Sequence, residues 1–376
     1  MMAFAERTGL LNDVGGPRRY LWTDAFAVCN FLSLYETTSD DAFADLAKRL
    51  VDQVHETLGR HRSDDPRSGW ISGLDEAEGR RHPTAGGLRI GKRLNERPAG
   101  QAQNEREEWE RDGQYFHYLT KWMHALARTA AVTSDVDYLR WALELAQAAH
   151  SAFVYRPSNA AAQRMYWKMS IDLSRPQVAS MGHHDPLDAQ LSYIELQRAR
   201  AMHSSTDDLP GLEAELIDAA ALCAGRSWVT EDPLGIGGLL VDIDRVSRMQ
   251  VDAHSEFSDM LDRLLLDART SLSILAGAYH FDASAEYRLA FREIGLSIGL
   301  HAVEAFHQRC PEDANSLTGD TVQELEALMQ FVPLARAIES FWRTSSNQSQ
   351  QTWRDHLDIN AVMLATSLLP AQFLTV

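Results

Sequence analysis

Apolar residues recur along most of this chain with the spacing of an α-helix. In residues 41–58 the apolar residues fall on one stripe of a helix, and the charged residues lie elsewhere on it. The stripe consists of Phe43, Leu46, Ala47, Leu50, Val54 and Leu58. A helix of this kind buries one face and exposes the other. Residues 22–35, 287–306 and 359–369 are instead apolar on nearly every face, which predicts helices buried on all sides.

The same spacing, followed along the whole chain, predicts an almost entirely helical protein. The expected helices lie near 22–36, 40–59, 110–131, 135–153, 186–203, 210–225, 236–250, 256–279, 285–308, 320–343 and 354–369. Short connections such as 37–39 and 132–134 alternate with long ones such as 60–109 and 154–185. Short turns join neighbouring helices into antiparallel pairs, and the long segments then lead from one pair to the next.

This alternation predicts an all-α fold, a single (α/α)6 toroid domain of paired antiparallel helices over residues 1–376. In such a ring the short turns lie on one rim, and the long segments, including the loop at 60–109, lie on the other. A linear helical solenoid is the alternative, although the sequence has no repeat of fixed period.

Charge and cysteine content limit which classes of partner, and which cellular compartment, we expect for this protein. The formal net charge of −17 repels phosphate backbones and anionic lipids, so neither nucleic acid nor membrane is expected. No apolar run reaches the roughly 18 residues of a membrane span, and the first residues do not resemble a signal peptide. Cys29, Cys223 and Cys310 are far apart and form no CxxC motif, which favours a cytoplasmic protein.

Polar and aromatic residues gather in the long segments and at the helix starts that follow them. Residues 109–115 read WERDGQY, and residues 353–356 read WRDH. These two stretches resemble the helix entrances of the six-hairpin glycosidase-like superfamily. The resemblance implies an α/α toroid and one of three activities, which are inverting glycoside hydrolysis, polysaccharide lysis and sugar epimerisation.

Glycoside hydrolysis requires two carboxyl groups, one on each side of the scissile bond. Asp112 and Asp358 are the first candidates for catalysis, and Asp185 and Glu110 follow them. Asp358 stands out because it lies inside an apolar helix, where a carboxylate needs a partner. Asp185 has a structural alternative, since an acidic residue before Pro186 is typical of a helix N-cap.

Stacking and hydrogen-bonding groups for a sugar are available in the same segments. The expected substrate contacts are Trp70, Arg89, Lys92, Trp109, Tyr115, His183, His184, Trp353 and His356. The tryptophans could equally pack beneath the loops, and His117 and His124 fit a helical core. His183 and His184 have no third ligand at a diagnostic spacing, and residues 86–92 lack the strand and the Ser or Thr of a P-loop. We therefore expect neither a metal nor a cofactor.

The segment from Arg60 to Arg97 is basic within an acidic chain. It contains nine Lys or Arg residues against six Asp or Glu residues, which favours a loop that covers the pocket and selects an anionic or highly polar substrate. The alternative is that these arginines pair with neighbouring helices or with the second subunit of a homodimer.

The function that fits these features best is a glycoside hydrolase acting through a carboxylate pair in a rim pocket, on a small-molecule or oligosaccharide substrate. Two alternatives remain. A sugar epimerase or lyase on the same fold would use His or Tyr for proton transfer, and a non-catalytic glycan-binding or ligand-binding protein would use the same rim for recognition alone.

Overall fold

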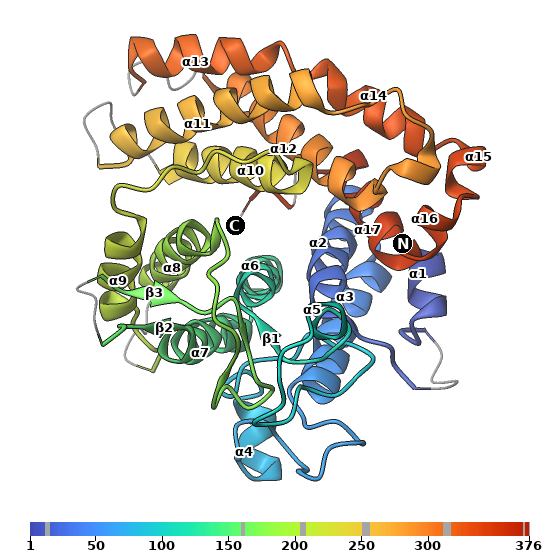
Figure 1. The fold of residues 1–376 in the computed structure, drawn as a ribbon. Helices are drawn as coiled ribbons and strands as arrows, with labels where there is room; N and C mark the ends of the chain where they lie inside the picture. The colour runs from blue at the N-terminus through green and yellow to red at the C-terminus, as the bar shows by residue number, and fades with distance from the viewer. Residues whose placement is uncertain are drawn as a thin grey trace. The chain divides into compact units, whose positions relative to one another are not determined.

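The computed structural model describes residues 1–11, 16–158, 162–203, 208–249, 256–310, 317–370 and 373–375 (Figure 1). Helices contain 63% of this part of the chain, which confirms the helical prediction. The described strands have only two or three residues each. The chain forms two compact units, residues 1–224 and residues 225–375. That both units act as one domain stays a prediction.

Three helical hairpins make up most of unit 1. They are α2 (Leu21–Thr38) with α3 (Asp41–Leu58), α6 (Phe116–Thr133) with α7 (Val136–Phe153), and α8 (Asp185–Met202) with α9 (Glu213–Cys223). The short helix α1 (Met2–Arg7) precedes them, and α4 (Glu76–Arg81) and α5 (Glu105–Glu108) interrupt the long segment before α6. The predicted alternation of short and long connections is confirmed within this unit.

The same two-residue Ser-Asp turn closes the first two hairpins. Ser39 and Ser134 end α2 and α6 in the left-handed conformation, with φ of 57° and 58°. Asp40 and Asp135 follow them, and each side chain accepts a hydrogen bond from the second backbone N–H of the next helix. A left-handed residue ends one helix and an aspartate N-cap begins the next. The chain therefore reverses its direction within two residues at both turns.

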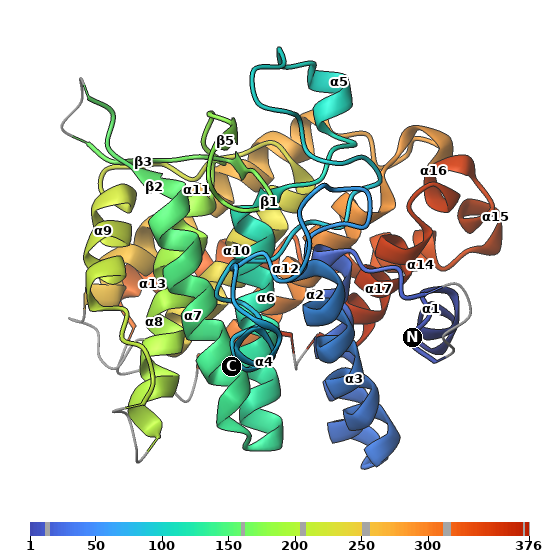
Figure 2. The same ribbon diagram turned by 90° about the horizontal axis from the view of Figure 1, so that it is seen from below.

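Short strands join the two long segments of unit 1. β1 (Gln114–Tyr115), β4 (Lys168–Met169) and β5 (Pro176–Val178) form one antiparallel sheet, and β2 (Val154–Tyr155) pairs with β3 (Arg164–Met165). Figure 2 shows these strands and α5 at one end of the unit 1 helices. The long segments are therefore folded against each other where α6 and α8 begin.

Unit 2 is built around two long helices, α10 (Pro233–Met249) and α12 (Ala290–Arg309). Its other elements are α11 (Glu256–Ala278), the 3-10 turn η1 (Ala285–Tyr287), α13 (Gly319–Met329), α14 (Pro333–Trp342), α15 (Ser345–Gln348), α16 (Gln351–Arg354) and α17 (Leu357–Leu368).

Glycines allow α10 and α12 to touch through their backbones. A Cβ on Gly237 would overlap the carbonyl group of Gly295, and one on Gly299 would overlap the carbonyl oxygen of Gly237. The Gly-rich stretch before residue 240 therefore serves close helix packing inside α10.

Two predicted helix boundaries are wrong for local reasons. The helix expected near 110–131 begins only at Phe116, because Gln114 and Tyr115 pair as a strand with β4. The helix expected near 320–343 is two helices, separated before Pro333, whose ring cannot continue a preceding helix.

No helix among the described residues is long and apolar enough to cross a membrane.

Candidate active site

Two buried aspartates lie in the first turn of α8. Asp185 is 4% exposed and Asp188 is 7% exposed. His184 occupies the N-cap position, and no side chain caps this helix end. Asp185 is the first residue of α8 and not its N-cap, and its carboxyl group accepts a hydrogen bond from the backbone N–H of Gly182, which precedes the helix.

Helix α6 faces this pair with a histidine and a lysine one turn apart. His117 Nδ1 lies 3.6 Å from Asp185 Oδ1, and Lys121 Nζ lies 2.8 Å from Asp188 Oδ1. The positions i and i+4 of a helix lie on one face, so α6 brings both groups to the start of α8.

The two groups that face each other are both held neutral near pH 7. Burial, helped by the charge of Asp188, raises the pKa of Asp185 to about 8. Burial lowers the pKa of His117 to about 4. The site thus combines a protonated carboxyl, an ion-paired aspartate and a neutral imidazole. Carboxyl groups with such different surroundings are typical of an acid and its partner in catalysis.

Two buried polar atoms at this place have no hydrogen-bond partner. One is Oδ2 of Asp185, and the other is Nε1 of Trp22, an α2 residue that is 8% exposed. The rings of Trp22 and His117 are 6.0 Å apart. Buried polar atoms are nearly always paired, so an unpaired acceptor and an unpaired donor here fit a ligand that carries hydroxyl groups.

Aromatic rings continue outward from His117. Tyr115 stacks on His117 at 5.4 Å, and the Trp167 ring lies parallel to His117 at 6.4 Å. Trp109 contacts Trp167 edge-to-face at 5.3 Å and is 54% exposed. On the other side, Tyr118 contacts His117 at 4.9 Å. These residues, with Trp22, form an aromatic row that joins the carboxyl pair to the surface.

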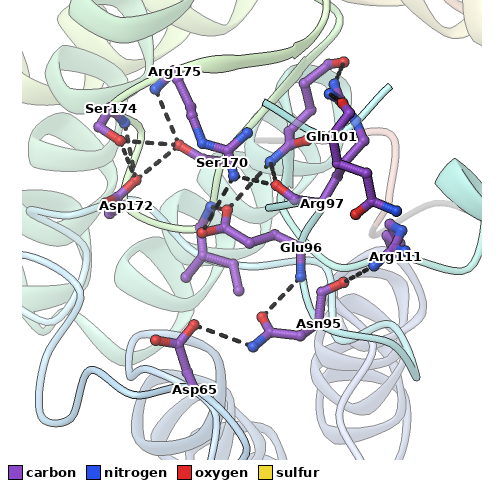
Figure 3. A network of polar contacts seen from close by, with 12 residues as sticks. Asp65, Asn95, Glu96, Arg97, Gln101, Arg111, Ser170, Asp172, Ser174 and Arg175 are labelled. Atoms are coloured by element: carbon purple, nitrogen blue, oxygen red, sulfur yellow. Dashed lines mark hydrogen bonds and ion pairs between the residues drawn. The ribbon is translucent and has the colours of Figure 1, made fainter. Parts of the chain in front are cut away.

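Hydrogen bonds and ion pairs fix the loops that carry the row to each other, and Figure 3 shows those around Asn95, Glu96 and Asp172. Glu96 accepts hydrogen bonds from Arg67 at 2.6 Å and from the backbone N–H of Ile171 at 2.7 Å. Arg67 also binds Asp65 and Asp172, at 2.9 and 2.6 Å. The segments 60–111 and 164–178 therefore form one rigid polar network.

A buried lysine anchors the end of that network beside Trp109. Lys168 is fully buried, and its ammonium binds the carboxylate of Glu108 at 2.9 Å. It also binds the main-chain carbonyls of Glu108 and Arg111, each at 2.8 Å. Arg97 holds the other carboxylate oxygen of Glu108 at 3.0 Å. All hydrogens of the lysine are used, so this group holds the loop in place.

Asp112, the first predicted catalytic residue, is fully buried in a polar cage. Arg89 and Arg62 bind its Oδ2 at 2.9 and 3.2 Å, and the backbone N–H groups of Gly91 and Gly113 donate to its Oδ1 at 2.9 and 3.1 Å. Arg89 also donates hydrogen bonds to the carbonyl oxygens of Arg60 and Thr57. These contacts favour a structural role for Asp112 and Arg89 in closing the loop.

The remaining predicted residues of unit 1 have different surroundings. Trp70 is 3% exposed and packs against the Arg60 guanidinium at 4.1 Å, and Glu110 is exposed. Lys92 places its ammonium over the Tyr20 ring at 5.4 Å. His183 is exposed and His184 is half-buried, and their rings are 4.8 Å apart just before Asp185.

Three predicted residues lie in unit 2. Trp353 is 3% exposed and stacks on Trp342 at 5.8 Å, which is a packing role. His356 is exposed and contacts Phe291 at 5.3 Å, and Asp358 is half-buried in the first turn of α17. That these residues share a pocket with α8 stays a prediction.

Sequence reasoning missed most of the residues that accompany Asp185. They are Trp22, His117, Tyr118, Lys121, Trp167 and Asp188. His117 and Lys121 fall at i, i+4 spacing near a helix start, and an acidic pair starts another helix. That signal was present, but only the tertiary packing shows that the two helix starts meet. Among the described residues no cluster of three His, Cys, Asp or Glu side chains could hold a metal ion.

Comparison with known proteins identifies the fold. No family model and no curated protein matches the sequence. The GH76 α-mannanase of Bacteroides thetaiotaomicron has a TM-score of 0.52, over 94% of this chain and 87% of that chain, at 9% identity. The GH76A α-1,6-mannanase of Salegentibacter sp. HEL1_6 has a TM-score of 0.50, over 94% and 91%, at 12% identity. This chain has their fold.

That fold is an all-α (α/α)6 toroid. The fold class predicted from the helix spacing is therefore confirmed, and the resemblance to the six-hairpin glycosidase-like superfamily agrees with it. The sequence identities are too low to carry any activity from these enzymes to this chain, so function has to be argued from the site.

Proposed function

We propose that this protein is a carbohydrate-active enzyme, a glycoside hydrolase whose site lies where α2, α6 and α8 begin. The observation that carries the proposal is the buried Asp185 carboxyl, which faces an aromatic row and whose pKa burial raises to about 8. Protonation of a leaving-group oxygen requires an acid of this kind. Aromatic rings stack on the apolar faces of sugars, and the unpaired atoms of Asp185 and Trp22 fit sugar hydroxyls.

The two aspartates have separate roles in this proposal. Asp185 donates its proton to the glycosidic oxygen as the bond to the leaving sugar breaks. Asp188, ion-paired with Lys121 at 2.8 Å, supplies the second carboxylate, which stabilises or attacks the positively charged sugar carbon. Water then adds to that carbon and returns a proton to Asp185, which releases the sugar and completes hydrolysis. His117, whose pKa burial lowers to about 4, lies beside the acid without adding a positive charge. Asp112 supports the loop in place of acting as the acid.

The proposal also concerns the charge of the substrate, which basic residues of the loop at 60–109 would select. Arg62, Arg67 and Arg89 bind carboxylates and carbonyls within the loop network, so they serve the structure first. Lys92 is closer to the aromatic row, through Tyr20. A preference for an anionic or highly polar sugar would therefore rest on Lys92. The homodimer and the cytoplasmic location stay predictions.

The experiment is a glycan screen with matched variants. Purified protein is incubated with α-mannan, xylan, glucomannan, dextran and their short oligosaccharides, and new reducing ends are measured. We expect Asp185→Asn and Asp188→Asn to lower turnover by a factor of about 100 or more. Asp282→Asn is the control, because that side chain is 92% exposed. Wild-type activity in the Asp185 variant would refute the assignment.

A sugar epimerase is the second candidate, because a neutral histidine beside a carboxyl can also move a proton at a sugar carbon. In that case His117→Gln would abolish exchange of a substrate C–H proton with solvent deuterium, and no new reducing ends would form. Binding with neither reaction would favour the non-catalytic alternative.

A further inference from the structure

We propose that Trp109 and Trp167 form a second sugar-binding subsite, separate from the carboxyl pair, so that the substrate is an oligosaccharide or polysaccharide chain. This inference rests on the proposed function and specifies its substrate class. It goes beyond the stacking residues of the reacting sugar, because it assigns a second ring of the same chain to the outer end of the aromatic row.

Trp109 is unusually exposed for its size. It is 54% exposed, whereas Trp22, Trp70, Trp122, Trp228, Trp342 and Trp353 are at most 8% exposed. Its contact with Trp167 is edge-to-face, with 75° between the rings. That geometry packs one ring against the other without stacking the two faces. An exposed indole that packing does not require is available to a ligand.

The exposed ring is also held in place. Trp109 directly follows Glu108, which is 5% exposed. Lys168 binds both the carboxylate and the main-chain carbonyl of Glu108, and Arg97 binds the carboxylate from the other side. A side chain on a clamped backbone loses little conformational freedom when a ligand binds. The loop therefore presents Trp109 in a preorganised position.

The row connects this ring to the acid without placing both under one sugar. Trp167 stands between Trp109 and His117, at 5.3 and 6.4 Å from their rings, and His117 stands between Trp167 and Asp185. A sugar that receives the proton of Asp185 lies against His117 and Trp22. A following sugar of the same chain reaches Trp167 and Trp109.

The neighbours of Trp109 fit a sugar chain better than an apolar protein surface. Glu107 and Glu110 are exposed on either side of it, and Arg111 is half-buried. Isolated apolar rings among charged groups match a ligand with apolar ring faces and many hydroxyls. A protein partner would instead require a continuous apolar patch.

The test measures binding and uses Asp185→Asn as the inactive background. Variants are run through native gels that contain α-mannan, xylan, glucomannan or dextran, and retardation gives the dissociation constant. We expect at least one polysaccharide to retard the background protein. Trp109→Ala should weaken that binding about fivefold to tenfold, and Trp109→Phe should restore most of it. Tyr287→Ala is the matched control, because Tyr287 is an exposed aromatic (79%) in unit 2.

The outcomes separate this inference from the proposed function. Equal retardation of Trp109→Ala and its background, or no retardation in any of the four gels, would overturn the subsite. Binding that depends on Trp109 without hydrolysis by wild-type protein would keep the subsite and refute the hydrolase. Hydrolysis that requires Asp185 but is equally fast for disaccharides and hexasaccharides would keep the hydrolase and refute the subsite.

Discussion

His117 Nδ1 lies 3.6 Å from Asp185 Oδ1, with a neutral imidazole facing a carboxyl group whose other oxygen is buried and unpaired. The arrangement favours the uncharged form of both groups, since neither has a counter-ion of its own. Asp188, one turn further along α8, has such a counter-ion in Lys121. This difference between two neighbouring aspartates has measurable consequences.

Asp185 should destabilise the folded protein as the pH rises. Its pKa is raised from 3.8 to about 8 by folding, so the folded state binds the proton more tightly than the unfolded state. Stability then falls between about pH 4 and pH 8. Asp185→Asn removes this loss. We expect the variant to have the melting temperature of wild type at pH 4 and a higher melting temperature than wild type at pH 8. Thermal unfolding followed by circular dichroism measures both.

The control for this melt is Asp282→Asn, whose exposed carboxyl should leave the pH dependence unchanged. A wild-type melting temperature that rises from pH 4 to pH 8 relative to Asp185→Asn would contradict the raised pKa. Global acid effects cancel because both proteins are compared at each pH.

Lys121 should set the upper pH limit of activity. Its charge lowers the pKa of Asp185, against the larger effects of burial and Asp188. In Lys121→Met the pKa of Asp185 should therefore rise above about 8. The alkaline limb of kcat/KM should move to higher pH, and the rate should fall because Asp188 loses its partner. Lys121→Arg should keep the wild-type limb. A limb that moves to lower pH in the Met variant would refute the assignment.

The helical spacing of the carboxylates predicts the stereochemistry. Asp185 and Asp188 are three residues apart on α8, so their Cβ atoms are about 5–6 Å apart. Carboxyl groups on side chains this close can reach the roughly 5–5.5 Å of retaining glycosidases more readily than the roughly 6.5–9.5 Å of inverting ones. We expect the first product to keep the anomeric configuration of the substrate, which proton NMR can follow. Immediate formation of the opposite anomer would exclude Asp188 as the nucleophile.

The fold followed from the sequence more fully than the site did. Helix spacing depends on local residue patterns, and repeated turns such as Ser39-Asp40 and Ser134-Asp135 are local signals. The sequence placed Asp112 ahead of Asp185 as a candidate for catalysis. Only the packing shows that Asp112 meets two arginines, whereas Asp185 meets a histidine and no arginine within ion-pair distance among the described residues.

Arg89 should matter for stability more than for binding. It is 9% exposed and joins Asp112 to the carbonyls of Arg60 and Thr57. Removal of one partner of a buried ion pair costs about 3–5 kcal/mol, and Arg62 offsets part of this cost. We expect Arg89→Ala to lower the free energy of unfolding by about 3 kcal/mol in urea. Lys92→Ala, which loses only a cation–π contact, should cost under about 1 kcal/mol.

If Arg89 served substrate binding instead, the two variants would show the opposite order. Arg89→Ala would then unfold at the wild-type urea concentration, and its KM would rise with a strong dependence on salt. A KM unchanged by salt together with a lower unfolding midpoint supports the structural role of the loop network.

Two adjacent glycines of α10 should respond in opposite directions to the same change. A methyl group on Gly237 would overlap the backbone of Gly295 in α12, whereas one on Gly238 meets no atom within 4 Å. Gly237→Ala must push the helices apart, which costs about 1–3 kcal/mol. Gly238→Ala should stabilise by up to about 1 kcal/mol, because alanine favours a helix. Urea unfolding of both variants measures the difference, and equal effects would show that α10 and α12 do not touch at Gly237.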